Sequence, residues 1–527
     1  MARPTGKKPV SVSPPLEATR GEHDSLLLVM SDLPAQPVSG RLLRGLSPYL
    51  DEQGAAHVVL LASRRHREPW GAAAAVVKYQ ELVHWARGPR GGVFRGAVWM
   101  GHPLTPDEVL KGFRIDPLGV VDWAARRMSA AVVSSAEPLR LAPCAVPKPW
   151  GRELWYTGIE QRGRARIKSA TGETELPYAL GMFPVPIVGE TERPPVLVKV
   201  LEPLPQPVLG DLYLEVHREK WEVYVALDVD PAAWPDGQGG LRAGLAPALL
   251  ERYRAAHGPA WEPALTRDLG AAIGAYEPVR RRMDALLDEA LLRRGADPAA
   301  GVPAALHDEL AGGLPPELRA EEARLRQQVE AFLGQASLAV GDVAAIRPGV
   351  LHSLQHGVTV VEFQTPTYER LIAMFAQKVL TQEHWDTAAA LERMEKAVYV
   401  PPAPEPLGST AFCRWERIVE FPEFQVLRLR LEAGARHPSA TAGGGSYQIV
   451  IGIAGRGDLA LPSGAALPLE KAVAYLLPAA LGTFSYRAHG DGPLTVLVTT
   501  PAGTDADGGI GRPAAPPARD APPEPGP

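Results

Sequence analysis

The chain has 527 residues, 46% of them hydrophobic, which suits a globular protein of two to four domains. A formal net charge of −5 provides no general attraction to nucleic acid or to anionic membranes, and no run of about 18 apolar residues predicts a membrane span. Cys144 and Cys413 are not spaced like zinc ligands, and residues 1–20 lack the apolar core of a signal peptide. We therefore expect a cytoplasmic protein that binds neither nucleic acid nor membranes.

The N-terminal region contains three apolar runs that suit buried strands and three segments with helical patterns. We expect strands over 25–30, 56–62 and 96–100, and helices over 40–53, 72–87 and 106–128. Strands that alternate with helices predict a small α/β unit with a parallel sheet over 25–140, after a disordered arm over 1–24. This unit carries no glycine-rich nucleotide-binding motif, and the sequence assigns it no function.

Beyond residue 140 the pattern becomes that of a β protein. Short strands between proline and glycine turns predict one β domain over 141–238 and 338–400, and a second over 401–502. The second β domain offers no set of ligand residues, so we expect it to bind no metal. Residues 503–527 are rich in Pro, Ala, Gly and Asp and are expected to be disordered. Helical periodicity interrupts the first β domain over 239–337, an inserted block in which we expect helices over 241–257, 261–294, 303–310 and 316–333.

The stretch 212–225 alternates apolar and polar residues on both sides of Arg218 and Glu219, which predicts a β-hairpin. Paired about that turn, Glu215 would face Glu222 and His217 would face Lys220, all on one side of the hairpin. Two opposed carboxylates repel each other unless a cation lies between them. The hairpin therefore predicts a divalent metal site.

A second stretch, 347–357, carries a Pro-Gly turn followed by His352. A strand after this turn could bring His352 to the carboxylates and the imidazole of the hairpin. Imidazole and carboxylate ligands together suit zinc, manganese, iron or nickel. The residues alone thus predict one metal site built from two segments about 130 residues apart.

These motifs and their order resemble the type I phosphomannose isomerases, which belong to the cupin superfamily. The likeness covers about residues 146–375 as an ordered series and extends more weakly into the C-terminal β region. Nothing in it covers residues 1–140. The segments that carry it are Trp150-Gly151, Leu197 to Lys199, Glu215-Val216-His217, Lys220-Trp221-Glu222 with Tyr224, His352, Glu362-Phe363-Gln364 and Tyr368-Glu369-Arg370.

The resemblance implies a mostly β fold: a double cupin (jelly-roll) domain with a helical insertion, here preceded by the small α/β unit. It also implies one divalent metal ion, zinc in the first place, with manganese or iron as alternatives. The family interconverts mannose 6-phosphate and fructose 6-phosphate by proton transfer through an enediol. Carried over by position, the metal ligands are Glu215, His217, Glu222 and His352; the catalytic residues are Lys220, Arg370 and Glu362; and the substrate-binding residues are Lys199, Trp150 and Gln364.

The chain departs from the family pattern at three places. Glu215 stands where the family has glutamine, a long loop after His217 is absent, and Glu369 is inserted before Arg370. We expect burial beside a metal to lower the pKa of Lys220, which would let it shuttle a proton.

Two other functions remain open: a non-catalytic sugar-binding or regulatory cupin, and another metal-dependent cupin enzyme such as an oxygenase.

Overall fold

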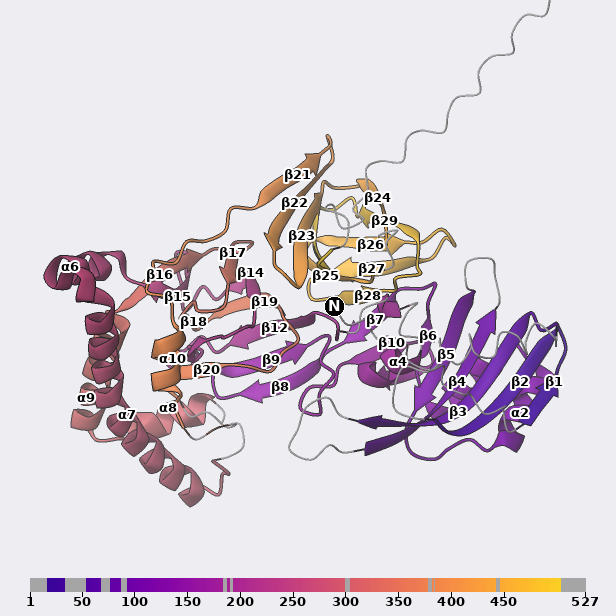
Figure 1. Ribbon diagram of the computed structural model, residues 1–527, viewed down its shortest axis with the longest axis horizontal. Helices are drawn as coiled ribbons and strands as arrows, with labels where there is room; N and C mark the ends of the chain where they lie inside the picture. The colour runs from indigo at the N-terminus through magenta and orange to yellow at the C-terminus, as the bar shows by residue number, and fades with distance from the viewer. Residues whose placement is uncertain are drawn as a thin grey trace, which may run out of the picture.

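The computed structural model describes residues 17–33, 54–67, 76–86, 92–182, 187–189, 193–298, 304–377, 382, 384–441 and 446–503. Figure 1 shows an elongated molecule with a helical block at one end and an N-terminal sheet at the other. Two pairs of sheets lie between them. No helix in the described ranges is both long enough and apolar enough to cross a membrane.

The N-terminal sheet has six strands in chain order, and only β2 and β3 pair in parallel. Two helices, α2 (Pro106–Ile115) and α3 (Val120–Met128), cover one of its faces through an apolar cluster that contains Phe113 and Val121. Thr105 and Glu108 form a capping box at the start of α2. The strands are β1 (Glu17–Arg20), β2 (Ser25–Leu33), β3 (His57–Arg67), β4 (Val76–Ala86), β5 (Val93–Trp99) and β6 (Val132–Ser134).

Three expectations for this region had different outcomes. The helix expected over 72–87 is wrong, because β4 occupies it and pairs along its whole length with β3. The mainly parallel sheet is also wrong, since four of the five strand pairs are antiparallel. The segment VVKYQELVHWA has β-branched and aromatic residues that suit a strand with both faces covered, and its long apolar run also fits a helix. The helix expected over 40–53 lies outside the described residues.

The first β domain consists of two facing sheets with an apolar cluster between them that includes Tyr224, Leu354 and Val360. The six-stranded sheet has the order β17-β14-β19-β12-β9-β8, and the five-stranded sheet has the order β16-β15-β18-β13-β20. The strands of the first are β8 (Cys144–Lys148), β9 (Gly151–Trp155), β12 (Leu197–Pro203), β14 (Glu222–Val229), β17 (Val343–Ile346) and β19 (Val358–Gln364). Those of the second are β13 (Leu214–Val216), β15 (Gly239–Leu245), β16 (Leu333–Leu338), β18 (His352–Leu354) and β20 (Leu371–Met374).

The predicted hairpin over 212–225 is wrong. β13 pairs with β18 and β20 in one sheet, whereas β14 pairs with β17 and β19 in the facing sheet. Glu215 is therefore opposite His352, and Glu222 is opposite Ile346 and Gln364. The segment 217–221 crosses between the two sheets, as in a jelly roll, and this crossing has the same alternating pattern as a hairpin.

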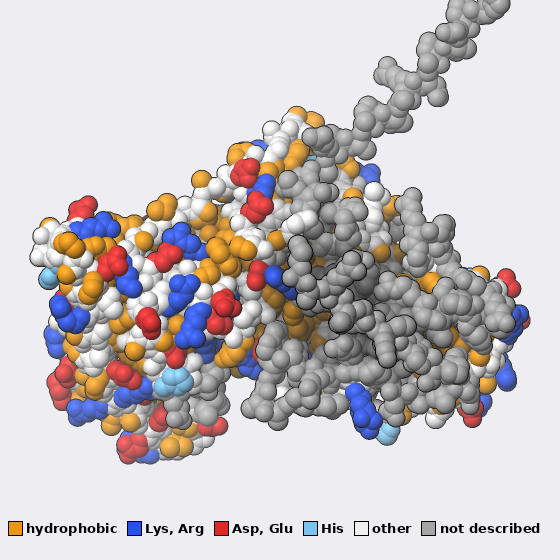
Figure 2. Space-filling model, in the orientation of Figure 1, with side chains coloured by type: hydrophobic (Ala, Val, Ile, Leu, Met, Phe, Trp, Pro, Cys, Tyr) orange, Lys and Arg blue, Asp and Glu red, His pale blue; other side chains and the backbone are white. Residues whose placement is uncertain are grey.

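The helical block emerges between β15 and β16, which pair with each other at its base. Its helices are α6 (Pro247–His257), α7 (Trp261–Arg293), α8 (Ala304–Gly312) and α9 (Pro316–Glu330). The first helix begins later than expected, because residues 239–245 form β15. α6, α7 and α9 pack on Leu214, Val216 and Leu371, at the outer side of the five-stranded sheet. Charged side chains of both signs are mixed over the visible face of this block (Figure 2).

The C-terminal β domain also has two facing sheets, with Leu429, Val496 and Phe484 in the cluster between them. Its larger sheet has the order β11-β10-β7-β28-β25-β30-β23-β22-β21, and the smaller one β24-β29-β26-β27. β7, β10 and β11 come from residues 139–175, so the N-terminal half of the chain completes this sheet. The strands are β7 (Leu139–Ala142), β10 (Arg166–Ser169), β11 (Gly172–Glu175), β21 (Glu405–Ser409), β22 (Cys413–Glu420), β23 (Phe424–Leu431), β24 (Arg436–Ala440), β25 (Gln448–Ala454), β26 (Arg456–Ala460), β27 (Ala466–Glu470), β28 (Ala474–Leu477), β29 (Thr483–Ala488) and β30 (Leu494–Pro501).

The predicted fold class, mostly β with paired jelly-roll sheets and a helical insertion, is confirmed, whereas the N-terminal unit is a mainly antiparallel sheet covered by two helices. One apolar cluster joins its parts. It contains Leu28 and Val58 of the N-terminal sheet, Val198 of the first β domain, and Val426 and Ile449 of the C-terminal domain. The three sheet regions therefore share one buried core.

Candidate metal centre and pocket

A row of polar side chains crosses the inner face of the six-stranded sheet. Strand pairing places Lys199 between Trp155 and Glu362, and places Glu222 beside Gln364. Residues two apart on a strand point to the same face, so Glu153, Glu362 and Tyr224 also point inward. Most of these side chains are buried, although charged residues are rarely buried without partners. Polar groups on this face thus take the place of part of the apolar core.

Three further groups reach this face: Glu215 and His352 from strands of the five-stranded sheet, and His217 from the crossing after β13. Glu215, His217 and His352 each offer a ligand atom, and the three atoms lie within 4.8 Å of one another. Glu222 approaches from the facing sheet, with its Oε2 at 3.4 Å from Nε2 of His217 and 3.4 Å from Nε2 of His352. All four residues predicted as metal ligands therefore converge, although by a route different from the predicted hairpin.

The donor atoms of this group fit a divalent metal ion. Both ring nitrogens of His217, Nε2 of His352 and Oε2 of Glu215 are buried and make no hydrogen bond within the described structure. The Nδ1–H of His352 donates to the Val350 carbonyl at 3.0 Å, which directs the lone pair of Nε2 toward Glu222. Buried polar atoms without partners are costly, and a metal ion would satisfy them.

The protonation of the two histidines differs. Burial and the nearby charge of Lys220 lower the pKa of His217, so its ring is neutral near pH 7. Burial also disfavours the charged form of His352, but its contact with Glu222 outweighs this and raises the pKa. A metal ion that binds here would therefore displace a proton from His352.

Glu222 is held by two further groups. Its Oε1 lies 2.6 Å from Nζ of Lys220, and its Oε2 accepts a hydrogen bond from the Tyr224 hydroxyl at 2.9 Å. Burial acts to lower the pKa of Lys220, but the carboxylates of Glu222, Glu215 and Glu362 outweigh it and raise that pKa. Without a metal ion, the direction is opposite to the lowering expected beside one, because the pocket places several anions around this ammonium group. Lys220 stays a cation and is a poor proton acceptor.

Glu362 has the properties of a proton carrier. It is buried, and Nζ of Lys199 lies 3.3 Å from its Oε2. Burial raises the pKa of Glu362 to about 8; Lys199 partly offsets this effect, and the charge of Glu222 adds to it. A group with this pKa exchanges a proton readily near neutral pH. Lys199 also donates to Oε1 of Gln364 at 2.6 Å, which orients that amide.

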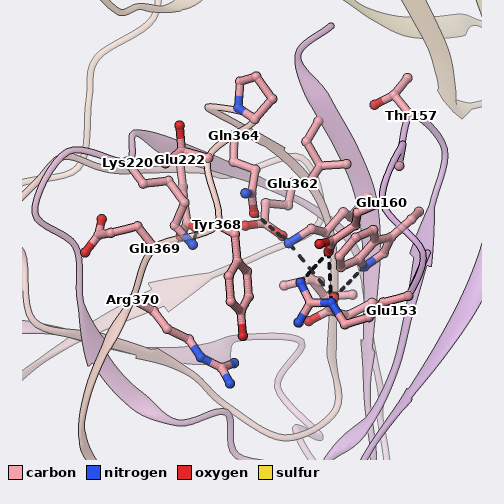
Figure 3. A pocket seen from close by; sticks show the side chains of 18 of the residues that line it. Glu153, Thr157, Glu160, Lys220, Glu222, Glu362, Gln364, Tyr368, Glu369 and Arg370 are labelled. Carbon is pink, nitrogen blue, oxygen red and sulfur yellow. Dashed lines mark hydrogen bonds and ion pairs between the residues drawn. The ribbon is translucent and has the colours of Figure 1, made fainter. Parts of the chain in front are cut away.

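These residues line one hollow of about 820 Å³, counting the space that is open to solvent. Figure 3 shows the Tyr368 ring in its middle, with Arg370 on one side and Glu153 and Glu160 on the other. Nine of the ten predicted site residues form this hollow or the adjoining ligand group. Trp150 does neither: it is 1% exposed and packs in the core cluster that contains Tyr213. We find it at a structural position, not in the wall of the pocket.

Several lining residues were missed by sequence reasoning. Glu153 and Trp155 lie on β9, beside Lys199, and Lys148 lies on β8 next to them. Their alternation in GRELW was visible in the sequence, but the pairing of β9 with β12 was not. Glu369 was noted only as an insertion. Its carboxylate accepts hydrogen bonds from the backbone N–H groups of Arg218 and Glu219.

The lining of the hollow comes from strands and loops of the first β domain. Among the lining residues, none belongs to the helical block over 247–330. The block instead packs behind β13 and β20. Leu214 and Val216 face these helices, whereas Glu215 between them joins the ligand group, because successive residues of a strand point to opposite faces.

No protein-family model matches the chain, and no curated protein matches it in sequence. Among solved structures, the chain is similar to mannose 6-phosphate isomerase from Bacillus subtilis, with 14% identity over 69% of this chain and 99% of that one, at a TM-score of 0.46. A mutant phosphomannose isomerase from Salmonella typhimurium is 15% identical over 69% and 100%, with a TM-score of 0.48. A zinc-bound mannose 6-phosphate isomerase is 15% identical over 69% and 99%, with a TM-score of 0.47. The resemblance predicted from the motifs is thus confirmed as a distant likeness.

Proposed function

We propose that this protein is a metal-dependent aldose–ketose isomerase that acts on a sugar or sugar phosphate. The observation that carries the proposal is the convergence of two buried imidazoles, the buried carboxyl group of Glu222 and the partly exposed one of Glu215 beside Glu362, in a hollow large enough for a small sugar. Glu215, His217, Glu222 and His352 would hold the metal ion. When bound, a divalent ion supplies polarisation of the sugar carbonyl and stabilises developing negative charge on its oxygen.

In this proposal, the position and charge of each residue determine its role in the reaction. Glu362 moves a proton between C1 and C2, because its pKa of about 8 lets it both accept and release one. Lys220 stays protonated and supports the charge of Glu222 at 2.6 Å. Gln364, oriented by Lys199, is placed to bond a sugar hydroxyl. Arg370 lines the hollow near Glu215 and can stabilise an oxyanion of the sugar.

The proposal is tested by metal content and turnover together. Elemental analysis of the full chain is expected to find about one divalent ion per chain, and the double variant His217→Ala with His352→Ala is expected to lose it. Turnover of aldoses, ketoses and their phosphates is then followed by NMR with zinc or manganese present. Metal binding without interconversion of any of these sugars would refute the isomerase and favour a binding module.

The matched control replaces two histidines outside the ligand group. His257→Ala with His489→Ala removes the same chemical groups from α6 and from the strand end after β29. This variant is expected to keep both metal and activity. Loss of metal from the control as well would mean that the fold, and not the ligand set, governs the metal content.

A further inference from the structure

The hollow contains almost as many positive as negative side chains. Among the described residues, five cationic and six carboxyl side chains line it, so the protein balances the charge of its own pocket. The cations are Lys148, Arg162, Lys199, Lys220 and Arg370, and the carboxyl side chains are Glu153, Glu160, Glu215, Glu222, Glu362 and Glu369.

The donor set best suited to a phosphoryl group is already occupied by Glu153. Its carboxylate lies 3.2 Å from Nζ of Lys148 and 3.9 Å from Nζ of Lys199, and it accepts a hydrogen bond from Nε1 of Trp155 at 2.5 Å. Burial raises the pKa of Glu153, but the two lysines outweigh it and lower the pKa to about 2. This internal anion therefore keeps its charge at neutral pH and remains where a phosphate would have to sit.

The other cations of the hollow also face groups of the chain. Arg162 donates to Glu160 at 2.9 Å and lies over the Tyr368 ring at 4.1 Å. Lys220 contacts Glu222, and Arg370 lies 5.4 Å from the Tyr213 ring.

A phosphate dianion would have to displace one of these carboxylates, several of which are buried. Leaving a buried carboxylate without its cation costs several kcal/mol, on the order of what a phosphate contact would return. A neutral sugar needs no such exchange. Its hydroxyl groups can donate to the oxygens of Glu160 and Gln364, which line the hollow.

We infer that the substrate of this site is an unphosphorylated aldose or ketose. The inference rests on the proposed function and names its substrate class. It departs from the sugar phosphate that the sequence motifs imply, because the lysines that would receive the phosphate hold Glu153 instead.

The test compares free sugars with their phosphate esters on the metal-loaded full chain. Mannose, glucose, fructose, xylose and ribose are each measured by NMR against the matching terminal phosphate. The expected result is a kcat/KM at least about tenfold higher for the best free sugar than for its phosphate. A preference for the phosphate esters overturns the inference and leaves the proposed isomerase standing.

When no turnover is seen, calorimetry measures the binding of each free sugar and of its phosphate. This measurement tests the inferred substrate class separately from the proposed isomerase activity. Absence of turnover on all pairs refutes the isomerase. Tighter binding of the free sugars would then still support the inferred ligand class, and tighter binding of the phosphates, or binding of neither, would overturn it.

Two variants that each remove one carboxylate charge test whether these carboxylates cause the preference for free sugars over phosphates. Glu160→Gln releases Arg162 from its carboxylate, and Glu153→Gln does the same for Lys148 and Lys199. The first variant disturbs fewer contacts and is the safer one for folding, because Glu153 also accepts a hydrogen bond from Trp155. Each is expected to shift the free-sugar to phosphate ratio at least about fivefold toward the phosphate. The control Glu202→Gln, which removes the partner of Arg152 outside the hollow, is expected to leave the ratio unchanged. An unchanged ratio in Glu160→Gln and in a folded Glu153→Gln overturns the inference.

Discussion

At the scale of single residues, the site depends on how burial and charge set the protonation of neighbouring groups. Glu153 and Glu362 are both buried carboxyl groups next to Lys199, but their pKa values are about 2 and about 8. The difference arises because Glu153 contacts two lysines, whereas Glu362 has Lys199 on one side and the charge of Glu222 on the other. One face of the six-stranded sheet thus provides both a permanent anion and a group suited to carry a proton.

Glu362→Gln is expected to lower kcat about 10²- to 10⁴-fold, since the amide cannot carry the proton. As a base, Glu362 must be ionised, so kcat of the unmodified protein should rise as the pH increases toward about 8 and then level off. Steady-state kinetics from pH 6 to 9 test this expectation. The control Glu416→Gln changes a carboxylate paired with Arg428 in the C-terminal sheet and should retain the profile. A rise in kcat with the same midpoint in Glu362→Gln would assign the titration to another group.

At the scale of elements, the crossing between β13 and β14 positions the metal ligands. Its backbone is held from three directions: Glu369 accepts from Arg218 and Glu219, the Gly349 N–H donates to the His217 carbonyl at 2.9 Å, and Arg393 donates to the Arg218 carbonyl at 2.8 Å. These contacts fix a turn whose own sequence has no strong turn residues. They therefore couple the segments before β18, before β20 and in α10 (Thr387–Arg393) to the geometry of His217.

Glu369→Ala is expected to weaken metal affinity about tenfold, because the 218–219 turn loses its acceptor and His217 becomes less well oriented. Titration of the metal-free protein with zinc measures the change. Glu395→Ala removes an exposed carboxylate paired with Arg347 near the same surface and serves as the control. Equal affinities in the two variants would show that the carboxylate of Glu369 does not position the ligands.

The stability of the N-terminal sheet is expected to depend on pH, because two histidines contact each other on neighbouring strands. Nδ1 of His57 and Nε2 of His84 are 3.1 Å apart across β3 and β4, and burial together with the charges of His57 and Arg95 lowers the pKa of His84 from 6.5 to about 4. The folded state thus binds fewer protons than the unfolded state between these values, so stability falls as the pH drops from about 6.5 to 4, by at most about 3 kcal/mol.

Urea unfolding of the unmodified chain and of His84→Gln at several pH values measures this effect. His84→Gln is expected to flatten the dependence between pH 6.5 and 4. His102→Gln, at an exposed position beyond β5, should retain it. Equal slopes in all three proteins would mean that other groups dominate the acid sensitivity.

At the scale of the whole molecule, segments that are far apart in the sequence form one sheet and one apolar core together. β7 pairs with β28, and β10 and β11 extend the same sheet, so residues 139–142 and 166–175 belong structurally to the C-terminal β domain. Val426, Ile449 and Leu497 share a core with residues of the N-terminal sheet. The boundary expected near residue 400 is therefore crossed by strand pairing and by apolar packing.

A truncated chain of residues 1–404 is expected to be insoluble or unfolded, because β7 loses its partner and the shared apolar cluster becomes exposed. Expression, gel filtration and circular dichroism of this fragment and of the full chain provide the comparison. A control that removes only 504–527 should behave like the full chain. A monomeric fragment 1–404 that binds metal would show that the first β domain folds independently.

The sequence by itself determined the class of the fold and which four residues converge in the candidate metal centre. Alternation and turn residues predicted strands such as β19 and β23, helical periodicity predicted α7 and α9, and the motif order brought Glu215, His217, Glu222 and His352 together correctly. These features are local, or depend on chemistry that few residue types supply.

Only the tertiary structure decided which strands are neighbours. An alternating pattern is the same in a hairpin and in a crossing between sheets, so the pairing of β13 with β18 could not be inferred from 212–225. For the same reason, the place of Glu153 between Lys148 and Lys199 was hidden, since it depends on β8, β9 and β12 lying side by side. The charge balance of the pocket, from which we infer a neutral sugar as substrate and not a phosphate ester, thus depends on the order of the strands and not on any one motif.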